Sequence, residues 1–164
     1  MALFSNNDEI SEELLKKSMN ATASAQEVVV NANAGEALDP EQDVNNKHSL
    51  AYLEANGIKA NDAIDILGDK DTFVARLKDF DSLAKSKYGN LMECKATMNI
   101  EKYCEESDEL KEACNYLGIE KLFIMAKNHK QKAKVKDTEF ILNNFKEYED
   151  EIMRVTNLIE EYLA

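Results

Sequence analysis

The stretch "DTEFILNNFKEYEDEIMRVTNLIEEYLA", residues 137–164, decides the fold class of this chain. Its apolar side chains recur in steps of three and four residues, at Ile141, Phe145, Tyr148, Ile152, Val155, Ile159 and Tyr162. Such spacing places them along one face of a helix, and Asp137 can cap its first turn. A stripe that is this narrow and persistent is typical of one helix of an antiparallel bundle.

The segments before this helix carry the same helical periodicity. A first short helix is expected to end at Gly57, and a second to run from Asn61, as its N-cap, to Gly68. Three long helices follow, over residues 69–98 (opened by Asp69 or Asp71), 100–117 and 119–135. Connections of two to four residues make neighbouring helices antiparallel. The sequence therefore predicts an all-α fold for residues 48–164, an antiparallel four-helix bundle preceded by two short helices.

The composition agrees with an all-α fold and indicates a single core. One proline, five glycines and no tryptophan, with little alternation of apolar and polar residues, leave little room for a sheet. The apolar stripes of three of the long helices predict that five side chains share the core: Phe80, Leu110, Phe145, Ile152 and Ile159.

Residues 1–47 differ from the rest of the chain in composition. They contain nine acidic residues against three lysines, a net charge of −6 and so half of the total of −12. Residues 31–46 hold the single proline, Pro40, and predict a linker, while residues 5–17 have the periodicity of one short helix. We expect an acidic, poorly structured segment that packs weakly on the bundle.

The net charge and the cysteines limit the classes of partner and the compartment. A net charge of −12 repels phosphate backbones and anionic lipids, so we expect neither nucleic acid nor a membrane as partner. The first residues lack the features of a signal peptide, which favours a cytoplasmic protein. Cys94, Cys104 and Cys114 lie ten residues apart and match no metal-ligand spacing, so we expect free thiols and no bound metal. We also expect that the protein has no cofactor and is a monomer.

No motif for a phosphate loop, a metalloprotease or a serine hydrolase is present. The two histidines, His48 and His129, are both expected on the surface. Five lysines within residues 127–136 predict a solvated basic face or, as the alternative, a docking site for an acidic partner. Four acidic residues line one face of the helix over residues 100–117, where a divalent ion would find too few converging ligands: Glu101, Glu105, Asp108 and Glu112.

Two stretches of the sequence share an order of features with one known family. The first, "LEANGIKANDAIDILGDKDTFVARLKDF" (residues 53–80), has a Gly-Ile step at Gly57, a Gly-Asp step at Gly68, and aromatic residues at Phe73 and Phe80. The second is "SDELKEACNYLG" (residues 107–118). Together they resemble the bacterial histidine-containing phosphotransfer (HPt) family, in which a segment like the second carries the phospho-accepting histidine. The resemblance covers roughly residues 50–163 and implies the four-helix bundle of that family.

The second stretch departs from the family where the chemistry would be. Asp108 stands at the position of the phosphohistidine, Lys111 matches the family's lysine, and Glu112 replaces a glycine that lets the partner approach. The phosphoryl transfer of this family needs an exposed nucleophilic imidazole, so the resemblance implies no catalytic residue in this chain. Asp108 lies two residues before core Leu110 and should therefore be exposed.

The resemblance thus leads to a non-catalytic HPt-like module that takes part in phosphorelay signalling through protein contacts. Its partner would be a response-regulator receiver domain or a histidine kinase. The expected docking face comprises Glu105, Asp108, Lys111, Glu112 and Asn115. Two alternatives stay open, an active phosphorelay protein with an unusual acceptor, and a structural or adaptor bundle of unrelated role.

Overall fold

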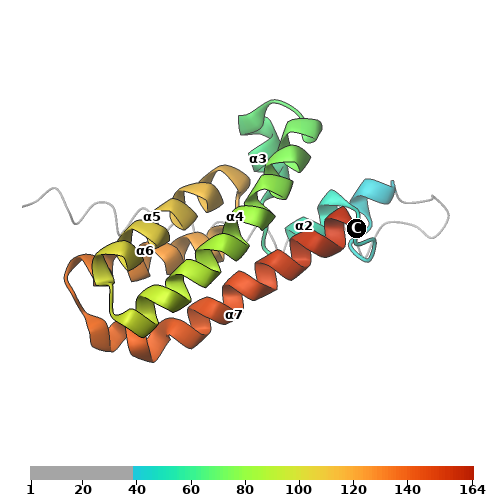
Figure 1. Cartoon of the computed structure of the whole chain (residues 1–164). Coiled ribbons are helices and arrows are strands. Elements are labelled where there is room, and N and C mark those ends of the chain that lie inside the picture. The colour runs from blue at the N-terminus through green and yellow to red at the C-terminus, as the bar shows by residue number, and fades with distance from the viewer. Residues whose placement is uncertain (1–38) are drawn as a thin grey trace, which may run out of the picture. The chain divides into compact units, whose positions relative to one another are not determined.

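The computed structural model describes residues 39–164, and in this range it contains six α-helices and no strand (Figure 1). The elements in chain order are the 3-10 helix η1 (Pro40–Gln42) and the α-helices α2 (Leu50–Ala55), α3 (Ala60–Leu67), α4 (Lys70–Thr97), α5 (Ile100–Leu117), α6 (Glu120–Lys134) and α7 (Thr138–Leu163). The expected all-α class is confirmed. The short helix expected in residues 5–17 lies outside the described residues.

The helix boundaries follow from side chains that cap the first turns. The Asp69 carboxylate accepts a hydrogen bond from the Thr72 N–H at 2.7 Å, and Asp137 accepts one from the Phe140 N–H at 3.1 Å. These bonds satisfy backbone donors that a helix start leaves unpaired. The prediction that Asp137 caps the last helix is confirmed, and of the two candidates for the start of α4 the structure has Asp69.

The expected cap of α3 is wrong. This helix begins at Ala60, and Lys59 occupies the N-cap position without a side-chain hydrogen bond. Asn61 lies inside the first turn, where its N–H donates to the Glu54 carboxylate at 2.8 Å. Because the acceptor comes from the neighbouring helix α2, the turn needs no cap from its own segment.

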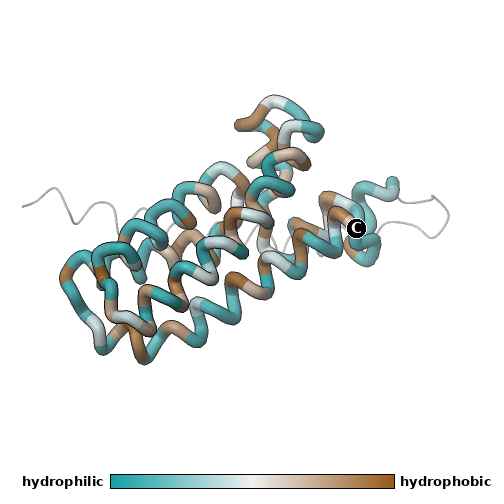
Figure 2. The backbone as a smooth tube through the Cα atoms, in the orientation of Figure 1, coloured by the Kyte–Doolittle hydropathy of each residue, from teal (hydrophilic) through white to brown (hydrophobic). Residues whose placement is uncertain are grey.

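The four long helices contribute most of the residues of the apolar core. Helix α4 contacts α5 and α7, and helix α6 contacts the same two helices. Figure 2 shows hydrophobic residues recurring along each long helix, separated by hydrophilic ones. All five side chains expected in the core are buried there, each with at most 3% of its surface exposed: Phe80, Leu110, Phe145, Ile152 and Ile159.

Two turns that are distant in sequence meet at one end of α5. Ile58 and Ile119 form an isolated antiparallel bridge, and the Lys59 N–H donates to the Gly118 carbonyl at 2.9 Å. Gly118 has φ +68°, and a Cβ there would lie 2.7 Å from the Lys59 carbonyl oxygen. Only glycine combines this backbone conformation with so close an approach. The junction holds the α2–α3 turn against the α5–α6 turn.

Residues 39–47, the last part of the predicted N-terminal segment, contact the helices. Glu41 forms an ion pair with Lys70 and accepts a hydrogen bond from the Leu50 N–H at 3.2 Å. Lys47 lies 3.0 Å from the Glu161 carboxylate of α7. The expectation of weak packing was made for residues 1–47 and stays a prediction, since residues 1–38 lie outside the described residues.

Candidate functional site

The five residues of the expected docking face lie on one side of α5. Glu105, Glu112 and Asn115 are exposed, while Asp108 and Lys111 are half-buried. The opposite side of the helix carries core residues such as Leu110, so α5 is divided into an outer charged face and an inner apolar face. We call the five residues the α5 outer face.

Asp108 is held by two lysines from two helices. Its Oδ1 atom lies 2.7 Å from the Lys130 Nζ of α6 and 3.0 Å from the Lys111 Nζ of α5. The Lys130 ammonium, followed by that of Lys111, lowers the pKa of the Asp108 carboxyl below its usual value. The carboxylate is therefore ionised at neutral pH.

The expectation that Asp108 is exposed is only partly right. Lys130 of α6 covers part of the Asp108 side chain, of which 41% remains exposed. Lys130 was expected on a solvated basic face, and its part in the site was missed. The available signal was the pairing of an acidic helix, α5, with a lysine-rich helix, α6, that follows after a tight turn. Lys111 also lies 3.1 Å from Glu112, so the α5 outer face carries one lysine among three carboxylates.

The expectation that His129 lies on a solvated surface is wrong. Only 2% of the residue is exposed, its ring stacks on Tyr148 with the centroids 4.2 Å apart, and its Nδ1 lies 2.8 Å from the Tyr103 hydroxyl. Burial lowers the pKa of the imidazole to about 4. The periodicity of α6 contains the missed signal, since Leu122, Ala126, His129 and Ala133 form its buried stripe.

His48 lies on the surface, as expected. The residue is exposed, and its ring Nδ1 lies 3.0 Å from the Tyr162 carbonyl oxygen near the end of α7. Among residues 39–164, His48 is therefore the histidine whose ring a partner could reach.

The three cysteines are free thiols, as expected. Cys94 and Cys114 are buried, and burial raises the pKa of both thiols. Within residues 39–164, no three His, Cys, Asp or Glu side chains come together in an arrangement that would hold a metal ion. The acidic run along α5 instead faces solvent or pairs with lysines.

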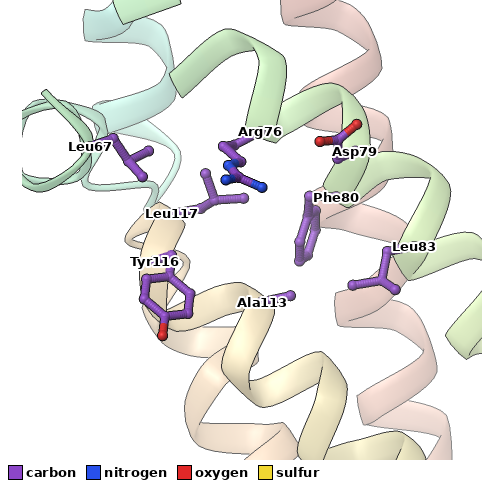
Figure 3. A pocket seen from close by; sticks show the side chains of 8 residues that line it. All are labelled: Leu67, Arg76, Asp79, Phe80, Leu83, Ala113, Tyr116 and Leu117. Carbon is purple, nitrogen blue, oxygen red and sulfur yellow. The ribbon is translucent and has the colours of Figure 1, made fainter. Parts of the chain in front are cut away.

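A pocket between α3, α4 and α5 escaped the sequence analysis. It has a volume of about 480 Å³ and is shown in Figure 3. Its lining comes from three helices: Leu67, Arg76, Asp79, Phe80, Leu83, Ala113, Tyr116 and Leu117. These residues span fifty positions of the sequence, so no local pattern could have indicated that they share one cavity.

No protein-family model, no curated protein and no solved structure matches this chain. The HPt resemblance therefore rests on the quoted stretches of sequence alone. No helix within residues 39–164 has the length and apolar character that crossing a membrane requires.

Proposed function

We propose that this protein is a non-catalytic, HPt-like interaction module of a bacterial phosphorelay, acting in the cytoplasm. In this proposal α4 to α7 form an antiparallel four-helix bundle, and the α5 outer face docks a receiver domain or a histidine kinase. The observation that carries the proposal is the state of Asp108, an ionised carboxylate fixed between Lys111 and Lys130 at the position where the family has its phosphohistidine.

The geometry around Asp108 supports docking over phosphoryl transfer. A carboxylate that accepts a phosphoryl group normally works in a cleft with a metal ion, whereas Asp108 stands on the outer face of a helix. The two lysines lower its pKa and thereby its nucleophilicity. A fixed negative charge flanked by ammonium groups is instead suited to electrostatic recognition of a partner surface.

The first alternative, an active relay protein with an unusual acceptor, has one candidate among the described histidines. His129 is shielded by Tyr103 and Tyr148 and is neutral at pH 7, so a partner's aspartyl phosphate cannot reach it. His48 is exposed but lies at the start of α2, away from the α5 outer face in the sequence and among different helices. Among the histidines the alternative therefore reduces to transfer onto His48, and transfer onto an aspartate in an unfamiliar geometry remains its other form.

One experiment separates these readings. The full chain is mixed with receiver domains phosphorylated by a small phosphodonor, and both complex formation and phosphate transfer are measured. We expect binding without transfer, weakened by Asp108→Ala and by Lys111→Ala through the loss of interface charges. Transfer that is abolished by His48→Ala would establish the relay alternative, and neither binding nor transfer would favour a structural or adaptor role.

A further inference from the structure

We propose that the pocket between α3, α4 and α5 binds a small amphipathic carboxylate, that is, an anion with an apolar body. This inference is independent of the proposed docking function. The volume of about 480 Å³ lies in the range of small-molecule sites, roughly 300–1,000 Å³. Six of the eight lining residues present apolar surface, and two are charged.

The apolar part of the pocket has a firm floor. Phe80 and Leu117 are members of the core, with 2% and 3% of their surface exposed, so packing from below fixes both side chains. Leu67, Leu83 and Ala113 are half-buried and form the walls. An apolar ligand body placed on this floor would remove the half-buried wall side chains from water without rearranging the core.

Arg76 supplies the polar end of the pocket. The chain has two arginines, and the other, Arg154, holds the Glu151 carboxylate with two nitrogens at 2.7 and 3.0 Å. Arg76 is exposed and forms no ion pair with any residue of the described range 39–164. Figure 3 shows its guanidinium beside Leu117 and facing the Phe80 ring, whereas the Asp79 carboxylate points away from the apolar side chains.

This juxtaposition defines the chemistry of the ligand. A guanidinium without an ion pair presents a planar fork of N–H donors that matches a carboxylate in two parallel hydrogen bonds. The net charge of −12 repels anions, but salt screens charges farther than about 8 Å at physiological ionic strength. Arg76 therefore acts locally, while the apolar body contributes most of the affinity and must be long enough to reach Phe80.

The test uses sodium octanoate, below its micellar concentration, titrated into the full chain by calorimetry and by methyl NMR. We expect saturable binding with shifts at Leu83 and Leu117, about tenfold tighter than 1-octanol or octylammonium. From hexanoate to octanoate each CH₂ should tighten binding about fourfold. Arg76→Gln should weaken octanoate at least fivefold, and Ala113→Phe should abolish binding by filling the pocket.

Lys78→Gln is the matched control, because Lys78 is a neighbouring exposed cation of α4 that does not line the pocket. It should leave octanoate affinity within twofold of the unchanged chain. The proposal is overturned if octanoate shows no saturable binding, if octanol binds as tightly as octanoate, or if Arg76→Gln and Lys78→Gln have equal effects. In the last two cases the cavity accepts apolar groups without recognising a carboxylate.

Discussion

The outer and inner faces of α5 have opposite effects on the charge of ionisable groups, although α6 contributes a residue to each, Lys130 outside and His129 inside. On the outer face Asp108 has a lowered pKa because Lys130 and Lys111 favour its charged form. Across the inner face His129 has a lowered pKa because burial disfavours its charged form. The same direction of shift therefore has two causes, attraction at the surface and desolvation in the core. The surface ion pairs of Asp108 therefore contribute less to the free energy of unfolding than the burial of His129, because water screens exposed charges but not buried ones.

The largest effect is expected from the inner face itself. Leu110→Ala removes a fully buried side chain from the core and should lower the free energy of unfolding by about 2–5 kcal/mol. Urea denaturation followed by circular dichroism measures this change. Glu105→Ala, on the outer face of the same helix, serves as the control and should change stability by less than about 0.5 kcal/mol. Equal losses in the two variants would mean that the division of α5 into two faces is wrong.

A second effect, of about 3 kcal/mol, should appear on acidification. The folded pKa of His129, about 4, lies below the usual histidine value of 6.5, so between these pH values the unfolded chain binds more protons. The contribution of His129 is thus complete above pH 6.5 and is lost as the pH falls through this range towards 4. At 1.36 kcal/mol for each pKa unit, the loss is about 3 kcal/mol.

The variant His129→Phe isolates this contribution from those of the carboxylates. Its stability should depend less steeply on pH than that of the unchanged chain between pH 6.5 and 4, whatever its stability at pH 7. Leu122→Ala removes another buried side chain of α6, one that binds no proton, so it should leave the slope unchanged and serves as the control. Identical slopes for the unchanged chain and His129→Phe would contradict the buried neutral imidazole.

Introducing the HPt residues at positions 108 and 112 of the α5 outer face should cost less stability than the changes above and should allow the chain to accept phosphate. Asp108→His alone should accept phosphate poorly, because Glu112 still crowds and repels a receiver's active site. Adding Glu112→Gly should improve acceptance, at a cost of about 1 kcal/mol for glycine inside a helix. Transfer from a phosphorylated receiver, followed over time, gives the measurement. If the unchanged chain accepts phosphate as readily as the double variant, the non-catalytic proposal fails.

The smallest effect on stability is expected at Asp108. Asp108→Ala removes a partly exposed ion-pair partner and should change the free energy of unfolding by no more than about 1 kcal/mol at pH 7. The stabilisation by the Asp108 ion pairs is present above the usual pKa of the carboxyl and is lost as the pH falls through the lowered pKa of Asp108. This loss occurs at lower pH than the loss of the His129 contribution. Denaturation of the unchanged chain and of Asp108→Ala at low and high salt tests the ion-pair contribution, since the difference in stability between the two should shrink as salt screens the ion pair.

The sequence by itself determined the helices and the core residues. Hydrophobic spacing and capping residues act within a few positions of the chain, so α5 was predicted with its observed limits, and Ile152 and Ile159 were placed in the core. The outward direction of Glu112 also follows from the sequence, because it depends only on the periodicity of one helix.

Only the tertiary structure decided which residues of different helices meet. The N-terminus of α3 is capped by Glu54 of α2, Asp108 is paired by Lys130 of α6, and His129 enters a core shared with Tyr103 of α5. The pocket beside Arg76 likewise needs three helices. The physical reason is that periodicity assigns a residue to a face, whereas the partner across that face, and with it the pKa and the accessibility, depends on how the helices pack.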